Sequence, residues 1–173
     1  MGLNQFQEIS TGEPILIPKA ASKASEIKQE FVRLIASKGF QGVTTTEENF
    51  QGKNYLVVYK DFGKLDKAAY AFHITSFGSQ DLAIETRYFE LSNSNRMKNQ
   101  AKGFAGVLGN VVLGFIAPRG RSLSDELDLF KKFGQAVSGG GAQVLGDNEH
   151  RESVLILQSL MSGLADIVNK YSG

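Results

Sequence analysis

Apolar and polar residues alternate with a period of two from Val43 to Leu91, a spacing that is typical of β-strands. Short polar turns divide the alternation into four expected strands over residues 44–46, 54–62, 70–75 and 82–91. Short connections between consecutive strands favour an antiparallel meander with one covered face. The apolar phase shifts at Tyr88 and Phe89, which predicts a β-bulge there.

Upstream of this region the period changes to about 3.6 and predicts a helix over residues 22–38. Gly39 follows the last turn and suits the left-handed residue that commonly ends a helix. Before the helix, residues 15–17 form a short apolar run between two prolines, which predicts an edge strand. Residues 1–13 show neither period, and we expect them to form a loosely ordered leader.

The C-terminal half of the chain shows helical patterns over residues 96–117, 124–137 and 148–171. In the last pattern, apolar residues recur at alternating spacings of three and four, as they do in helices that pack along another helix. The residues of this apolar seam are Val154, Leu157, Met161, Leu164, Val168 and Tyr171. The seam is suited either to an intramolecular helix pair or to self-association.

Together the patterns predict an α+β fold in a single domain, residues 1–173. An αβ half, residues 14–92, holds an antiparallel sheet of four to five strands in a β-meander. A helical half, residues 93–173, joins the helix at 22–38 in covering one face of the sheet. A second layer is expected because a sheet with an apolar face must bury that face against other elements.

Composition excludes several classes of chemistry. The chain has 42% apolar and 21% charged residues with a formal net charge of +1, which is typical of a globular domain and excludes a globally basic nucleic-acid binder. It has no cysteine, so thiol catalysis, disulfides and thiolate metal sites are excluded. We expect no metal and no cofactor, because there are two histidines and no phosphate-binding glycine motif.

The first residues lack the cationic stretch and apolar run of a secretory signal, and we expect a cytoplasmic protein. A more unusual region is residues 91–124, which contains five cations and no acidic residue. Its central apolar run, residues 104–117, measures about 21 Å as a helix, which is too short for a bilayer core of about 30 Å.

Three interpretations of this region are open. It is a buried helix that another backbone approaches closely, a peripheral contact with an anionic lipid surface, or a mobile flap or self-association surface. Its candidate contact residues are Arg96, Lys98, Lys102, Phe104, Gly106, Gly109, Gly114, Phe115, Arg119 and Arg121.

An alternative polar site consists of His73, Glu85 and Arg87, which lie on neighbouring expected strands and can frame a small active site. The same residues are also consistent with a purely structural role, as hydrogen-bonded or solvated side chains on the surface of the sheet. The leading functional hypothesis is a non-catalytic binding or protein-interaction module, with a protein partner or a second copy bound through the C-terminal helices. The alternatives are a peripheral membrane or apolar-ligand binder that uses residues 103–118 and a small enzyme with a site near His73.

Overall fold

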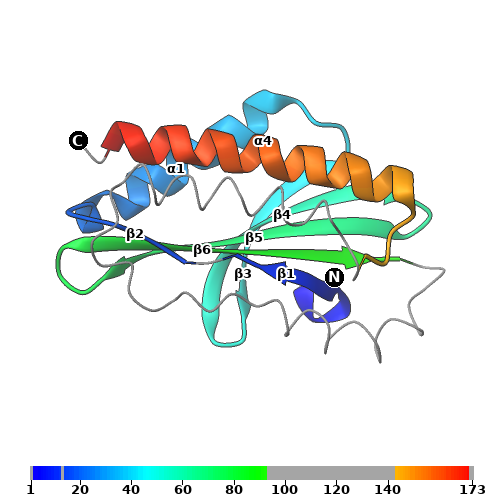
Figure 1. Cartoon of the computed structure of the whole chain (residues 1–173), viewed down its shortest axis with the longest axis horizontal. Coiled ribbons are helices and arrows are strands. Elements are labelled where there is room, and N and C mark those ends of the chain that lie inside the picture. The colour runs from blue at the N-terminus through cyan, green and yellow to red at the C-terminus, as the bar shows by residue number, and fades with distance from the viewer. Residues whose placement is uncertain (1, 13, 93–142, 172–173) are drawn as a thin grey trace.

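A computed structural model of the chain describes residues 2–12, 14–92 and 143–171 (Figure 1). The described elements are the 3-10 helices η1 (Leu3–Gln5) and η2 (Ala21–Lys23), the strands β1 (Gln7–Thr11), β2 (Ile15–Ile17), β3 (Val43–Phe50), β4 (Lys53–Gly63), β5 (Asp66–Phe77) and β6 (Asp81–Leu91), and the helices α1 (Ala24–Lys38) and α4 (Asp147–Tyr171). They give an α+β fold, as the patterns predict. The helices expected over residues 96–117 and 124–137 lie outside the described residues.

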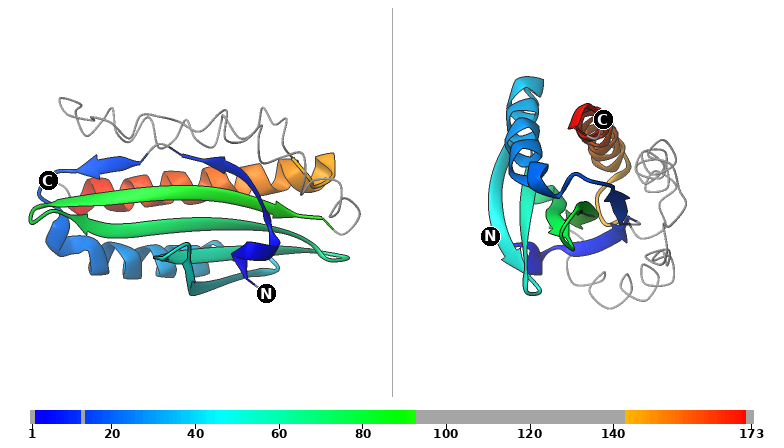
Figure 2. Two further views of the ribbon diagram at one scale, coloured as in Figure 1. Left: turned by 90° about the horizontal axis from the view of Figure 1, so that it is seen from below. Right: turned by 90° about the vertical axis from the view of Figure 1, so that its left-hand side faces the viewer.

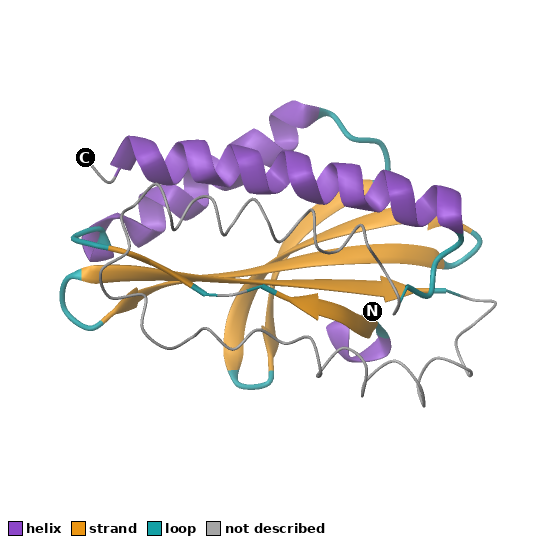
Figure 3. Ribbon diagram, in the orientation of Figure 1, coloured by secondary structure: helices purple, strands orange, loops and turns teal. Residues whose placement is uncertain are grey.

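The strands form one antiparallel sheet in the order β1-β6-β5-β4-β3, and β2 pairs with another part of β6 (Figure 3). The β3–β4 hairpin illustrates how local sequence sets this arrangement. Its two-residue turn, Gln51-Gly52, has φ angles of 54° and 82°. Positive φ at both central residues defines the type I′ turn, whose twist matches that of the strands it joins.

Residues 1–13 were expected to be a loosely ordered leader, but they contain η1 and β1. β1 pairs antiparallel with β6, from Gln7 opposite Glu90 to Thr11 opposite Arg87. The sequence does not show this strand, because β1 has only five residues and one buried position and so gives no readable alternation. Pairing with a strand that is distant in the sequence holds this segment, and no local pattern encodes such pairing.

β6 pairs with β5 without a shift in register, and the irregularity predicted at Tyr88 and Phe89 is found instead in the ladder between β6 and β1. The register shift lies in the facing strand β1, between Glu8 and Ser10. The apolar phase changes in the sequence for a different reason. Tyr88 and Phe89 belong to two separate cores on opposite faces of the sheet, and both are buried.

One face of the sheet packs against α1 and α4, which both run along that side (Figures 1 and 2). The ring of Phe72 on β5 meets the ring of Phe31 on α1 edge-on, with centroids 4.8 Å apart. The hydroxyl of Tyr70 lies 2.7 Å from the hydroxyl of Ser153 on α4. The prediction that helices cover this face stays a prediction, because residues 93–142 of the expected helical half lie outside the described part of the chain.

The opposite face carries a second apolar core, whereas the sequence predicts one covered face. The buried residues of this core are Leu3, Phe6, Tyr55, Val57, Ala69, Ala71, Phe89 and Leu91. On β4, all four residues from Tyr55 to Val58 are buried, so this strand is apolar toward both sides. The period of two is therefore weakest where the sheet is most deeply buried.

α1 and α4 lie side by side and are in close contact at Gly163, where an added Cβ would lie 2.2 Å from Cδ2 of Leu34. The seam residues Val154, Leu157, Met161, Leu164 and Val168 are buried within the chain. At the far end of the helix pair, Glu30 of α1 accepts hydrogen bonds from Lys170 at 2.8 Å and Tyr171 at 2.7 Å. The helix pair is therefore fixed by close packing and by polar contacts at its end.

Gly163→Leu is expected to lower the free energy of unfolding, because overpacking against Leu34 costs about 1–3 kcal/mol. Loss of the glycine recovers up to about 1 kcal/mol of helix propensity, which offsets part of this cost. Urea unfolding followed by circular dichroism measures the net change. Ser162→Leu, at the neighbouring exposed position, is the matched control and should not destabilise the chain. Equal stability of the two variants would contradict the close helix contact.

Candidate functional site

The ten candidate contact residues of the basic and apolar region all lie outside the described residues. They are Arg96, Lys98, Lys102, Phe104, Gly106, Gly109, Gly114, Phe115, Arg119 and Arg121. Their assignment to a buried helix, a lipid contact or a partner surface therefore stays a prediction. In the part of the chain that the structure describes, no helix is long and apolar enough to cross a membrane.

The residues of the alternative polar site lie side by side on the face of the sheet opposite α1 and α4. His73 stands directly opposite Glu85 in the β5–β6 register, and Nε of Arg87 is 3.6 Å from Oε1 of Glu85. Neighbouring side chains join them. Nζ of Lys53 is 3.0 Å from Glu85, and Arg87 donates a hydrogen bond of 3.0 Å to Gln51. We call this group the His73 cluster.

The charges of the His73 cluster are paired with one another. Arg87 lies 3.8 Å from Glu8 of β1, and its guanidinium is 5.8 Å from the ring centre of Tyr55. Nδ1 of His73 is 2.8 Å from the backbone oxygen of Asn54. These contacts tie the β3–β4 turn and β1 to the middle of the sheet. Among the residues that the structure describes, no group of three or more His, Asp or Glu side chains is placed to hold a metal ion.

Among the strands that the structure describes, β3 is the last at one edge of the sheet. Two contacts show which of its residues bond β4. The N–H of Asp61 donates to the carbonyl oxygen of Gly42 at 2.9 Å, and Phe50 pairs with Lys53 across the two-residue turn. Hydrogen-bonded pairs recur at every second residue of an antiparallel ladder, so the even-numbered residues of β3 bond β4. The outward residues, whose N–H and C=O groups point away from the sheet, are Val43, Thr45, Glu47 and Asn49.

β3 has two charged side chains, and both are engaged by the same chain. The carboxylate of Glu47 is 2.9 Å from Nζ of Lys28 on α1, and this hydrogen bond lowers the pKa of Glu47 below its usual value. The carboxylate of Glu48 accepts the N–H of Leu3 at 2.7 Å and the hydroxyl of Tyr59. Both carboxylates are therefore held over the faces of the sheet by groups of the same chain and do not extend along the outward backbone groups of β3.

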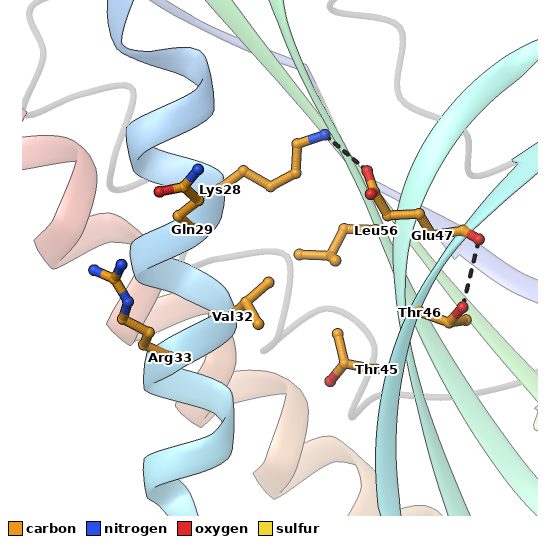
Figure 4. A pocket seen from close by; sticks show the side chains of 8 residues that line it. All are labelled: Lys28, Gln29, Val32, Arg33, Thr45, Thr46, Glu47 and Leu56. Carbon is orange, nitrogen blue, oxygen red and sulfur yellow. Dashed lines mark hydrogen bonds and ion pairs between the residues drawn. The ribbon is translucent and has the colours of Figure 1, made fainter.

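A groove of about 480 Å³ lies between α1 and β3 (Figure 4). Lys28 and Val32 line its helix side, Thr45 and Glu47 line its strand side, and the buried side chain of Leu56 lies between them. Val32 is 38% exposed, which leaves an apolar side chain open beside the edge strand. The groove and the outward edge of β3 therefore form one continuous surface.

A second groove, of about 390 Å³, lies between the loop after α1 and the first half of α4. Lys60 is buried there, with Nζ 2.5 Å from the backbone oxygen of Gln41 and 3.3 Å from the carboxylate of Glu152. These partners compensate the buried ammonium group. The arrangement holds the loop against α4, which is a structural role.

Glu90 is fully buried at the end of β6, and its carboxylate has four partners among the described residues. Oε1 accepts the backbone N–H groups of Val144 at 2.8 Å and Leu145 at 3.1 Å. Oε2 contacts the hydroxyl of Tyr88 and Nδ1 of His150. The Glu90 network thereby attaches the start of α4 to the end of β6.

Comparison with known proteins found no match among family models, curated proteins or solved structures.

Two of these features are missed by reasoning from the sequence, although each leaves a signal. The run from Thr44 to Glu48 is polar at both odd and even positions, which is typical of a strand exposed on both faces. Glu90 stands between Phe89 and Leu91, where an acidic residue in an apolar stretch indicates a buried partner. Neither signal reveals which residues would be the partners.

Glu90→Gln is expected to lower the free energy of unfolding by about 2–4 kcal/mol. A glutamine has one acceptor oxygen where the carboxylate has two. It can therefore accept from the N–H groups of Val144 and Leu145 or take the place of the oxygen beside Tyr88 and His150, and it lacks the charge that strengthens both sets of contacts. Denaturant unfolding at pH 7 measures the loss. Glu26→Gln, on the exposed side of α1, is the control and should change stability by less than about 0.5 kcal/mol. Similar values for the two variants would show that the Glu90 network is not stabilising.

All five tyrosines are expected to titrate above the usual value near 10. Burial raises the pKa of Tyr55 to about 12 and raises the pKa of Tyr59, Tyr70 and Tyr88, while a hydrogen bond to Glu30 raises the pKa of Tyr171. Because the folded pKa values lie above the unfolded ones, this stabilisation is complete below pH 10 and is lost as the pH rises further. Absorbance near 295 nm should therefore rise at higher pH than it does for the unfolded chain, with most of the rise as the chain unfolds. A full phenolate step at pH 10 with unchanged circular dichroism would contradict this burial.

Proposed function

We propose that the chain is a non-catalytic protein-interaction module that self-associates, with β3 of one copy pairing with β3 of a second copy. The observation that carries this proposal is the row of outward N–H and C=O groups along a regular strand of eight residues. An edge strand of this kind is a template for another strand, because its backbone groups gain hydrogen bonds from an extended chain placed alongside.

The other edge of the sheet is built differently, which supports assigning the interface to β3. Along β6 the edge is divided between β1 and β2, with a register shift between Glu8 and Ser10 and with Pro14 before β2. Bulges, prolines and short strands are devices that protect a sheet edge from pairing. β3 contains no proline or lysine and pairs with β4 from Val43 to Phe50 without a register shift.

A second copy is the partner that suits the charges on this edge. The chain has a formal net charge of +1, so two copies repel each other little at long range. The carboxylates of Glu47 and Glu48 are engaged by groups of their own chain. The exposed side chains of β3 include Thr44 and Thr46. Threonine pairs across neighbouring strands are favourable.

The sequence patterns suggest self-association through the C-terminal helices, whereas the geometry favours β3. Most of the apolar seam of α4 is buried within the chain and is engaged by α1 and the sheet. Leu155 is an exposed large apolar residue on α4, with a relative exposure of 63%. A single exposed leucine is ordinary for a protein surface and does not mark an interface.

The alternative functions have less support. A peripheral membrane or apolar-ligand binder depends on residues 103–118, which lie outside the described residues and stay a prediction. A small enzyme at the His73 cluster is not favoured, because Glu85 and Arg87 are paired with each other and with neighbouring charges. The expected cytoplasmic location and the expected lack of a cofactor also stay predictions.

Sedimentation velocity between roughly 1 µM and 1 mM tests the proposal, a range that suits a small edge-to-edge interface. The average mass is expected to rise with concentration from 18.8 kDa toward twice that value. A constant mass of 18.8 kDa over the whole range would overturn the proposed function.

Thr45→Pro is expected to abolish the rise in mass, because it removes an outward N–H and leaves the bonds between β3 and β4 in place. Thr45→Val is the matched control, since it keeps the N–H and a residue of high β-propensity, and it should still associate. Circular dichroism and the melting temperature check that both variants are folded. Association of a folded Thr45→Pro variant to the same extent as the native chain would place the interface elsewhere.

A further inference from the structure

Two copies of β3 can pair in only a few registers. In an antiparallel ladder, the residues that exchange both backbone hydrogen bonds stand directly opposite each other. On β3 only the outward residues can do so, and an outward residue of one copy must therefore face an outward residue of the other. A two-fold axis passes through the centre of such a pair of identical strands.

The number of outward residues that find partners separates these registers. When the axis lies at Thr46, Val43 faces Asn49 and Thr45 faces Glu47, so all four outward residues are paired. When the axis lies at Thr45, Asn49 is left beyond the end of the facing strand. When it lies at Glu47, Val43 is left in the same way. The register centred on Thr46 therefore forms the most backbone hydrogen bonds.

Side-chain charges favour the same register. An axis at Glu47 would set this carboxylate directly opposite its own copy, and like charges in facing positions are unfavourable. With the axis at Thr46, Glu47 faces Thr45 and Glu48 faces Thr44. No carboxylate of β3 then faces another one.

We infer that the chain forms a two-fold symmetric dimer in which Thr46 faces Thr46 of the second copy and the two sheets join into one. This inference rests on the proposed self-association and adds its geometry. Even-numbered residues form the pairs without backbone hydrogen bonds in this ladder, whose Cα atoms lie about 4.5 Å apart. A separation of this size is within the range that a disulfide spans.

The chain has no cysteine, so a single introduced cysteine reports on one contact. Thr46→Cys, oxidised in a glutathione buffer at a concentration where the native chain sediments as a dimer, is expected to migrate mainly as a covalent dimer on a non-reducing gel. Thr44→Cys is the matched control, because it is exposed on the same face of the same strand. In this register it lies four residues, about 14 Å, from its own copy and should remain a monomer on the gel.

A second pair of variants needs no disulfide. Thr46→Lys sets two like charges directly opposite each other and is expected to raise the dissociation constant of the dimer about tenfold or more. Thr44→Lys introduces the same charge opposite Glu48 and should not weaken the dimer. Sedimentation of the two folded variants at matched concentrations measures the difference.

The outcomes separate the register from the self-association itself. Covalent dimers of Thr44→Cys without those of Thr46→Cys would overturn the register and leave pairing through β3 in place. If neither variant forms a covalent dimer while the chain sediments as a dimer, the register centred on Thr46 is overturned. The Thr45→Pro variant then decides whether β3 is the interface, because it removes an outward N–H that every one of these registers uses. A native chain that stays monomeric overturns the proposed function, and the inference falls with it.

Discussion

A buried carboxylate is costly unless hydrogen bonds replace the water it loses, and Glu90 meets this requirement with groups that lie more than 50 residues away in the chain. The backbone N–H groups of Val144 and Leu145, just before α4, bind one of its oxygens. These hydrogen bonds hold the residues just before α4 at the end of β6. The position of the long helix on the sheet depends on this interaction.

α4 in turn contacts α1, which also packs directly on the sheet through Phe31 and Phe72. The two helices meet at Gly163 and are linked again through Glu30 near the end of α4. α1 is thus held at the side of β3, where Lys28 engages Glu47 and Val32 lines the groove. The edge strand is thus linked to α1 by this ion pair, and its outward groups keep a regular spacing along a ladder without register shifts. Such regularity is what a second strand requires.

The parts of the fold that follow from the sequence are those with long repeating patterns. The helices α1 and α4 give clear helical periods over 15 and 25 residues. Short polar turns divide the meander from β3 to β6 into its strands, although the alternation is weak in β3 and β4. β1 is too short to show an alternation, and the polar run from Thr44 to Glu48 indicates a strand exposed on both faces without showing which strands lie beside it. The partners of Glu90 depend on tertiary packing, and a single polar residue in an apolar run does not name them. The position of β3 at the edge and the partners of Glu90 both depend on the order of the strands and on contacts between the helices and the sheet. The periodicity of the sequence carries no information about either.

Leu3 lies just before β1, at the opposite side of the strand order from β3, yet its N–H is bound by Glu48 of β3. The segment around η1 is therefore held at two places. β1 pairs with β6, and the carboxylate of Glu48 binds the segment to β3. The same carboxylate also accepts the hydroxyl of Tyr59 of β4. Replacing this single side chain would therefore remove two contacts at once, one that joins the N-terminal segment to β3 and one that joins β3 to its neighbouring strand.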